Sequence, residues 1–170
     1  MNRGHYSSFH LLIQRIASTR IVASFFSHFL HHIDRPLLKL TRNRFSLTGF
    51  LSGVPVVTLT TVGAKSGQKR TLPLVCILDE HDPTTFALVA SNWGQRHYPA
   101  WYHNLKACSR ATCTIFGRTA EYEAHEASDA EYDKFWQNAM ATYMGFTLYK
   151  QRASNRRIPI MVMRPVSNLP

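Results

Sequence analysis

The stretch Thr60-Thr61-Val62-Gly63-Ala64-Lys65-Ser66-Gly67-Gln68-Lys69-Arg70 decides the fold class of this chain. It places a short glycine-containing turn between two runs rich in Val, Thr, Leu and Ile, at 54–62 and 69–78. Such runs are typical of β-strands, and the six-residue loop between them predicts an antiparallel hairpin. Cations lie on or just after the turn: Lys65, Lys69 and Arg70. The hairpin therefore has a basic tip that is suited to phosphate or carboxylate groups.

More strand-like and helical segments follow this hairpin in the sequence. We expect strands at 84–91, 111–116, 118–127 and 158–163, and a short helix at 98–107. A second helix should begin at Ser128, because Ser128-Asp129-Ala130-Glu131 has the form of a capping box. Short strands at hairpin spacing with helices between and beside them predict an α+β fold, namely a small antiparallel barrel with peripheral helices.

The N-terminal part has a different pattern. Residues 9–33 read as helical, and within 21–33 aromatic and aliphatic residues share one face while serines and histidines lie opposite. This pattern fits either an interfacial membrane helix or a helix that packs on the domain. Pro36 ends the segment. We therefore expect an amphipathic helical segment at 1–36, a linker or flap at 37–53, and the barrel domain at 54–170.

Composition limits the class of protein. The chain has 170 residues and a formal net charge of +10, with its cations spread along the sequence rather than gathered in one run. Such a field attracts anions, but the dispersed pattern argues against nucleic acid as the partner. The cysteines form no C-x-x-C pair and are odd in number, which predicts reduced thiols in a cytoplasmic protein: Cys76, Cys108 and Cys113. We see no signal peptide and no membrane-spanning run, so membrane contact is expected only at the inner surface, through residues 9–33.

Other site classes fit the sequence poorly. A nucleotide-binding P-loop needs Gly directly before the Lys and a helix afterwards, whereas here Ala64 precedes Lys65 and a strand follows. His28, His31 and His32 have helical metal-site spacing, but no acidic or Cys partner matches them, so we expect a polar helix face and no metal. No catalytic triad stands out in the sequence. A solvated basic hairpin tip and a plain core role for Trp101 remain open alternatives.

Four motifs in order resemble the deazaflavin-dependent nitroreductase family. They are Thr60 to Leu74, Ala90-Ser91 with Gly94, Pro99 to Leu105, and an Arg at 156 or 157 before Ile158-Pro159. The resemblance covers about residues 54–165. It implies a split β-barrel related to FMN-binding oxidoreductases, and it implies that the chain binds coenzyme F420, an 8-hydroxy-5-deazaflavin.

The resemblance also assigns residues to the two ends of the coenzyme. The residues implied for the phosphate and glutamate-rich tail are Lys65, Ser66, Arg70, Thr71, Pro73 and Leu74, with Lys69 in support. Those implied for the deazaflavin ring are Ala90, Ser91, Trp101, Tyr102 and Asn104. This chain departs from the family pattern at two positions: Ala64 stands where an Arg is usual, and Phe146 stands where a Tyr is usual. Tyr143 and Tyr149 lie close enough in sequence to replace that Tyr.

The function implied is an oxidoreductase in which the reduced coenzyme transfers hydride to a quinone or nitroaromatic acceptor. Ser91 is our candidate for orienting the ring or the substrate, and Tyr143, Tyr149, His103 or water for supplying a proton. A non-catalytic deazaflavin or tetrapyrrole carrier on the same fold is the alternative. A basic module for membrane surfaces or nucleic acid is a third hypothesis.

Overall fold

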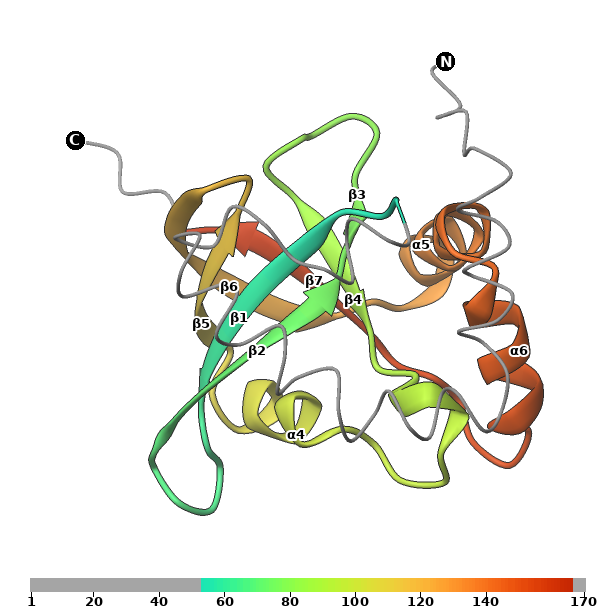
Figure 1. Ribbon diagram of the computed structural model, residues 1–170, viewed down its shortest axis with the longest axis horizontal. Coiled ribbons are helices and arrows are strands. Elements are labelled where there is room, and N and C mark those ends of the chain that lie inside the picture. Colours follow the sequence, from blue (N-terminus) through green and yellow to red (C-terminus); the bar gives the residue numbers. More distant parts are fainter. Residues whose placement is uncertain (1–52, 167–170) are drawn as a thin grey trace.

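The computed structural model describes residues 53–166, and Figure 1 shows their arrangement. The strands are β1 (Val56–Val62), β2 (Lys69–Val75), β3 (Ile77–Leu78), β4 (Phe86–Val89), β5 (Arg110–Ile115), β6 (Arg118–Glu126) and β7 (Ile160–Pro165). The helices are α4 (Ala100–Ala107), α5 (Asp129–Thr142) and α6 (Gly145–Arg152), together with the short 3₁₀ turn η1 (Asn92–Gly94).

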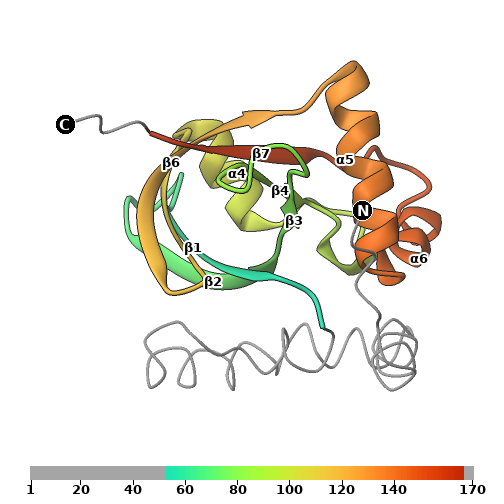
Figure 2. The same ribbon diagram turned by 90° about the horizontal axis from the view of Figure 1, so that it is seen from above.

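The strands form one antiparallel sheet that curls on itself (Figure 2). Their order is β2-β1-β5-β6-β7-β4-β3, so β2 and β3 lie at opposite edges of the sheet. In sequence, however, only Cys76 separates these two strands. The sheet must therefore bend until its edges come together, which gives a half-barrel and confirms the predicted split-barrel fold.

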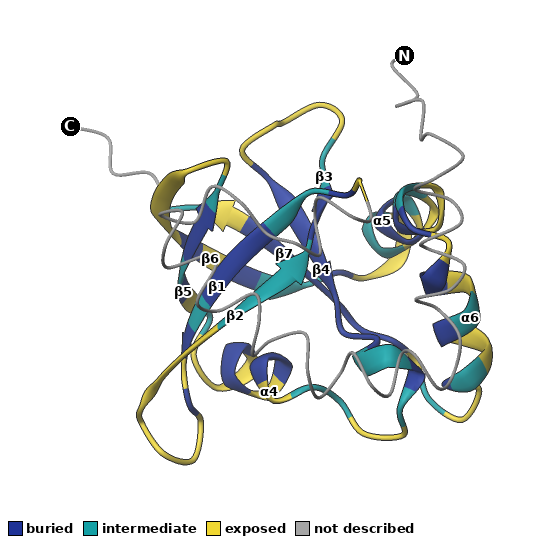
Figure 3. Cartoon of the chain, in the orientation of Figure 1, coloured by how far each residue is buried: buried dark blue, intermediate teal, exposed yellow. Residues whose placement is uncertain are grey.

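Two buried clusters lie on opposite sides of β4 and β7. Ala87, Val89, Ile160 and Val162 belong to the cluster that packs under α5 and α6. The alternate residues of the same two strands, including Leu88 and Met161, belong to the cluster inside the barrel. Figure 3 shows β4 and most of β7 as buried. Because both faces of these strands are covered, they read in sequence as continuous apolar runs.

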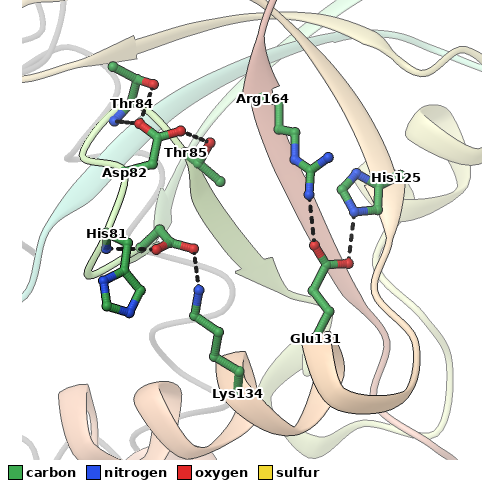
Figure 4. A network of polar contacts seen from close by, with 9 residues as sticks. His81, Asp82, Thr84, Thr85, His125, Glu131, Lys134 and Arg164 are labelled. Atoms are coloured by element: carbon green, nitrogen blue, oxygen red, sulfur yellow. Dashed lines mark hydrogen bonds and ion pairs between the residues drawn. The ribbon is translucent and has the colours of Figure 1, made fainter.

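Polar contacts fasten α5 to the sheet (Figure 4). The Glu131 carboxylate lies 2.8 Å from His125 Nε2 on β6 and accepts from Arg164 Nη2 on β7 at 3.1 Å. Lys134 donates to Asp79 at 2.6 Å, which ties the same helix to the turn after β3. The start of α5 is thus held against three parts of the barrel.

The capping box predicted at Ser128 does not form. Ser128 is the N-cap of α5, but its side chain makes no capping hydrogen bond. One reason is Asp129, whose φ of 46° lies outside the helical region, and another is Glu131, which binds His125 and Arg164 instead of reaching back.

The other predicted segments agree with the structure to within a few residues, with two exceptions. The run 69–78 is divided at Cys76 into β2 and β3, and α6 was not predicted as a separate helix.

Several expectations concern residues outside the described part. These are the amphipathic segment 1–36, the predicted linker 37–53 apart from its last residue, and the histidines at 28, 31 and 32. Within residues 53–166, no helix has the length and apolarity needed to cross a membrane.

Candidate functional site

The basic turn joins β1 to β2 at one end of the sheet (Figure 1). The predicted tail residues Lys65, Ser66, Lys69, Arg70 and Thr71 are exposed there, while Pro73 and Leu74 are half-buried farther along β2. Gly67 has a φ of 64°, a left-handed conformation that glycine adopts without a steric penalty. The turn therefore presents three cationic side chains to solvent from a defined backbone.

The main-chain N–H groups of the turn are largely used within the protein. Gly63 N donates to Gln68 O at 2.8 Å, and Gly67 N donates to Gly63 O at 2.8 Å. Ser66 N also donates to Gly63 O, and Ala64 N donates to a side chain of α4. Main-chain N–H groups of a turn can help to hold an anion, but these four already donate within the protein. The geometry leaves that task mainly to Lys65, Lys69 and Arg70.

Asn104 connects helix α4 to this turn. Its Oδ1 accepts from Ala64 N at 3.0 Å, and its Nδ2 donates to Thr61 Oγ1 at 3.0 Å. The Asn104 side chain is buried and both of its polar atoms are engaged. Asn104 thus positions the turn, and Ala64 is held through its main chain.

The aromatic residues of α4 are also held by protein contacts. Trp101 is buried in the cluster inside the barrel. The Tyr102 hydroxyl donates to Glu126 Oε2 at 3.0 Å, and burial together with Glu126 raises the pKa of Tyr102 to about 12. The alternative that Trp101 is core agrees with its position. These two side chains therefore anchor α4 across the barrel.

Ala90 and Ser91 lie where β4 leaves the sheet. Ala90 is completely buried and Ser91 nearly so, at 7% exposure. The main chain of Ser91 is bound on both sides: its N–H donates to Val89 O at 2.8 Å and its O accepts from Gly94 N at 2.9 Å. Its hydroxyl makes no hydrogen bond to any residue between 53 and 166. A fixed backbone with a free hydroxyl suits a residue that orients a bound group.

Sequence reasoning left undecided which late arginine matters and gave neither of them a role. The structure separates the two. Arg156 donates to main-chain oxygens beside Ser91 and its guanidinium lies 4.7 Å from the ring centroid of Tyr98. Arg157 lies over the ring of Tyr132 at 4.2 Å, away from Ser91. The Arg-x-Ile-Pro motif was the available signal for Arg156, but two adjacent arginines made it ambiguous.

The tyrosines considered as proton donors lie in the cluster under α5 and α6. The hydroxyls of Tyr143 and Tyr149 are 3.2 Å apart and hydrogen-bond to each other. Burial raises the pKa of both phenols, so each is a weak acid. Phe146, the departure from the family pattern, packs edge-on against Tyr143. The pair therefore forms part of the packing, with its hydroxyls directed at each other.

The site has a recognisable layout. The chain runs from Ser91 through η1 into α4, and Asn104 on α4 reaches the basic turn. In Figure 1, α4 lies between the basic turn and η1. Among the described residues, no group of three His, Cys, Asp or Glu side chains is arranged to hold a metal. The arrangement offers cations at one end and a small, hydroxyl-bearing turn at the other.

Comparison with known proteins identifies similar chains. A family model described as F420H(2)-dependent quinone reductase matches residues 39–165. An F420H(2)-dependent quinone reductase of Mycobacterium tuberculosis (strain ATCC 25618 / H37Rv) is 34% identical over 114 residues, which are 64% of this chain and 72% of that protein.

Solved structures extend the comparison to the fold. An F420-H2 dependent reductase (FDR-A) is 31% identical, with a TM-score of 0.58 over 65% of this chain and 94% of that chain. The heme storage protein HutZ from Vibrio cholerae has a TM-score of 0.50 over 79% of this chain and 91% of that chain. At 8% identity, this second similarity concerns the fold alone.

Proposed function

The chain belongs to the F420H(2)-dependent quinone reductase family, and we therefore propose that it is an oxidoreductase that uses reduced coenzyme F420 to reduce a quinone. The observation that carries the proposal is one continuous arrangement. Three cations lie beside one turn, and Asn104 connects that turn to the helix that follows Ser91.

The residues at the turn fit the polyanionic tail of the coenzyme. Lys65, Lys69 and Arg70 are exposed, and within residues 53–166 none of them forms a salt bridge with a carboxylate. Arg70 Nη2 donates to Gln68 Oε1 at 3.2 Å, which restrains its side chain and leaves other guanidinium N–H groups for a ligand. Charge-assisted hydrogen bonds from such groups are the strong ones. Thr71, Pro73 and Leu74 continue the same strand and would border the tail.

The residues near Ser91 fit the ring. Ala90 is small and lies beside a hydroxyl that has no hydrogen bond among the described residues. When bound, the reduced coenzyme supplies a hydride, and the protein supplies binding, orientation and exclusion of water. Ser91 would donate to, or accept from, the ring or the acceptor. A supporting role is proposed for three residues of α4, which would hold this helix in place: Trp101, Tyr102 and Asn104.

We propose that neither Tyr143 nor Tyr149 supplies the proton. Tyr143 and Tyr149 direct their hydroxyls at each other and have raised pKa values. Water, or His103 on the exposed side of α4, would supply the proton instead. His103 lies edge-on to Tyr102, with ring centroids 5.5 Å apart, which restrains its ring.

The experiment is anaerobic mixing of the purified protein with reduced F420 and menadione, followed through the absorbance of the coenzyme. A quinone reductase regenerates oxidised coenzyme at a rate proportional to protein concentration. A nitroaromatic acceptor in a parallel reaction tests the second substrate class that we considered from sequence.

The same experiment separates the other hypotheses. A carrier would bind the coenzyme without oxidising it, and a nucleic-acid module would not bind it. Membrane contact through residues 9–33 is tested separately, by co-sedimentation with anionic vesicles, because that segment lies outside the described residues.

A further inference from the structure

The turn that follows Ser91 has an unusual backbone. Asn92, Trp93 and Gly94 have φ values of 47°, 59° and 78°, so three successive residues are left-handed and two of them are not glycine. L-residues adopt this region at a cost in free energy, and such a conformation persists only where its surroundings enforce it. Something must therefore hold the segment from Ser91 to Gln95 in this form.

Arg156 contacts both ends of that turn. Its Nη2 donates to Ser91 O at 2.7 Å and its Nε donates to Gln95 O at 2.9 Å. Longer contacts run from Nη1 to the main-chain oxygens of Ala90 and Arg157, at 3.5 and 3.4 Å. No described carboxylate forms a salt bridge with this guanidinium. Its donors are therefore directed at main-chain carbonyls of the turn.

The side chain of Arg156 is itself restrained. Its guanidinium lies 4.7 Å from the ring centroid of Tyr98, and the residue is only half exposed to solvent. A planar fork can bind two carbonyls at once, whereas a lysine ammonium acts as a single point. Gly94 adds a second constraint, because a Cβ there would come within 2.7 Å of Arg152 Cβ. The turn is thus contacted by Arg156 on one side and packed closely against Arg152 at Gly94.

We propose that Arg156 is a positioning residue: by bridging the carbonyls of Ser91 and Gln95, it maintains the left-handed turn and so sets the direction of the Ser91 hydroxyl. The proposal rests on the proposed function, in which Ser91 orients the reacting groups. Arg156 does not touch those groups itself. Its effect is expected on the rate of hydride transfer more than on coenzyme affinity, since the cations of the tail site lie on the β1–β2 hairpin, away from the turn after β4.

Hydrogen exchange of the coenzyme-free protein provides a test without any turnover. We compare wild type, Arg156→Gln and the neighbouring control Arg157→Gln by mass spectrometry. The amides of residues 91–95 should exchange faster in Arg156→Gln and at the wild-type rate in Arg157→Gln. Equal exchange in all three proteins would overturn the proposal.

The kinetic test asks whether Arg156 acts through Ser91. In the menadione reaction, Arg156→Gln should lower kcat by about 10- to 100-fold, as small misplacements of reacting groups do. Arg156→Lys, which keeps the charge but loses the fork, should recover only part of this loss. In the double variant, Arg156→Gln should lower kcat little further than Ser91→Ala does alone, because both residues act through the Ser91 hydroxyl. Independent, multiplicative effects would overturn the positioning role.

The two readouts distinguish failure of this inference from failure of the proposed function. A wild-type protein without turnover would overturn the quinone reductase assignment and the catalytic consequence of Arg156. Hydrogen exchange would still decide whether Arg156 holds the turn. If Arg156→Gln fails to fold, Arg156→Lys gives the same comparison with a milder change.

Discussion

The side-chain oxygen of Asn104 accepts a hydrogen bond from the main-chain N–H of Ala64, at 3.0 Å and across 40 positions of sequence. This contact fixes the basic turn to helix α4. The bond uses the main chain of Ala64, so it does not depend on the side chain at that position.

Loss of this contact should loosen the turn without changing its charge. Asn104→Ala removes two hydrogen bonds to a buried amide, which should lower the free energy of unfolding by about 1–3 kcal/mol. Coenzyme affinity should fall, while its dependence on salt stays as in wild type because all three cations remain. Calorimetric titration at low and high salt measures both quantities. The exposed Asn155→Ala serves as the control, and a stable Asn104→Ala protein with normal affinity would refute the bracing role.

Removal of a cation from the turn should change the salt dependence of coenzyme binding and leave the stability of the protein nearly unchanged. Lys65→Ala or Arg70→Ala should weaken coenzyme binding by about 1–3 kcal/mol, the usual worth of a charge-assisted hydrogen bond, and should reduce the effect of salt. Stability should change little because both side chains are exposed. Arg118→Ala is a matched control, since it lies at the other end of the sheet, roughly 17 Å along the strands. Affinity equal to wild type in both turn variants, at any salt, would remove the tail assignment.

Ser91→Ala tests the ring end of the site. We expect kcat/KM to fall by roughly 10- to 100-fold, which is about 1.4–2.8 kcal/mol of transition-state stabilisation. Coenzyme affinity and melting temperature should hardly move, because the lost hydroxyl makes no hydrogen bond to residues 53–166 and the remote cations remain. Ser154→Ala, which is exposed, controls for general effects of the substitution. Normal turnover of Ser91→Ala with several quinones would exclude Ser91 from the mechanism.

Two buried thiols predict a loss of stability at alkaline pH. Burial raises the pKa of both Cys76 and Cys113 from 9.0 to about 12. A group whose pKa is raised by folding contributes fully below its unfolded value and loses that contribution as pH rises toward its folded value. Stability should therefore decline between about pH 9 and pH 12, by up to about 1.4 kcal/mol per pH unit for each thiol.

Melting temperature measured against pH checks this prediction. Cys113→Ala should show a shallower alkaline decline than wild type, even though the small cavity lowers its stability throughout. Cys108→Ala, an exposed position, should follow the wild-type slope. Identical slopes in all three proteins would show that the buried thiols do not govern the alkaline limit.

The parts of this structure that sequence predicts are local. The hairpin at 54–78 follows from alternating β-forming residues around a glycine turn, and α4 from a proline near the start of an aromatic helix. Contacts between distant residues were not predictable: the bond between Asn104 and Ala64 joins two elements whose relative placement depends on closure of the whole sheet. The role of Arg156 was not predictable either, because the sequence does not distinguish it from Arg157, and only the folded structure shows which of them contacts the turn after Ser91.

The directions of side chains are the second feature that the sequence does not predict. Tyr143 and Tyr149 are six residues apart, and a sequence pattern does not show that their hydroxyls meet in a buried cluster. The resemblance assigns Tyr102 and Trp101 to the ring wall, but it does not show that Tyr102 hydrogen-bonds to Glu126 or that Trp101 packs in the cluster inside the barrel. Motif order thus predicted the fold, whereas the contacts that each side chain makes depend on how the elements pack.

In the proposed site the coenzyme is held at two separate ends, so loss of a contact at each end should change a different kinetic parameter. The oxidation of reduced F420 by menadione is measured for Arg70→Ala and Ser91→Ala over a range of coenzyme concentrations. We expect a raised KM for the coenzyme with nearly unchanged kcat in Arg70→Ala, and a lowered kcat with nearly unchanged KM in Ser91→Ala. If both variants change the same parameter, or neither changes any, the coenzyme is not held at two such ends.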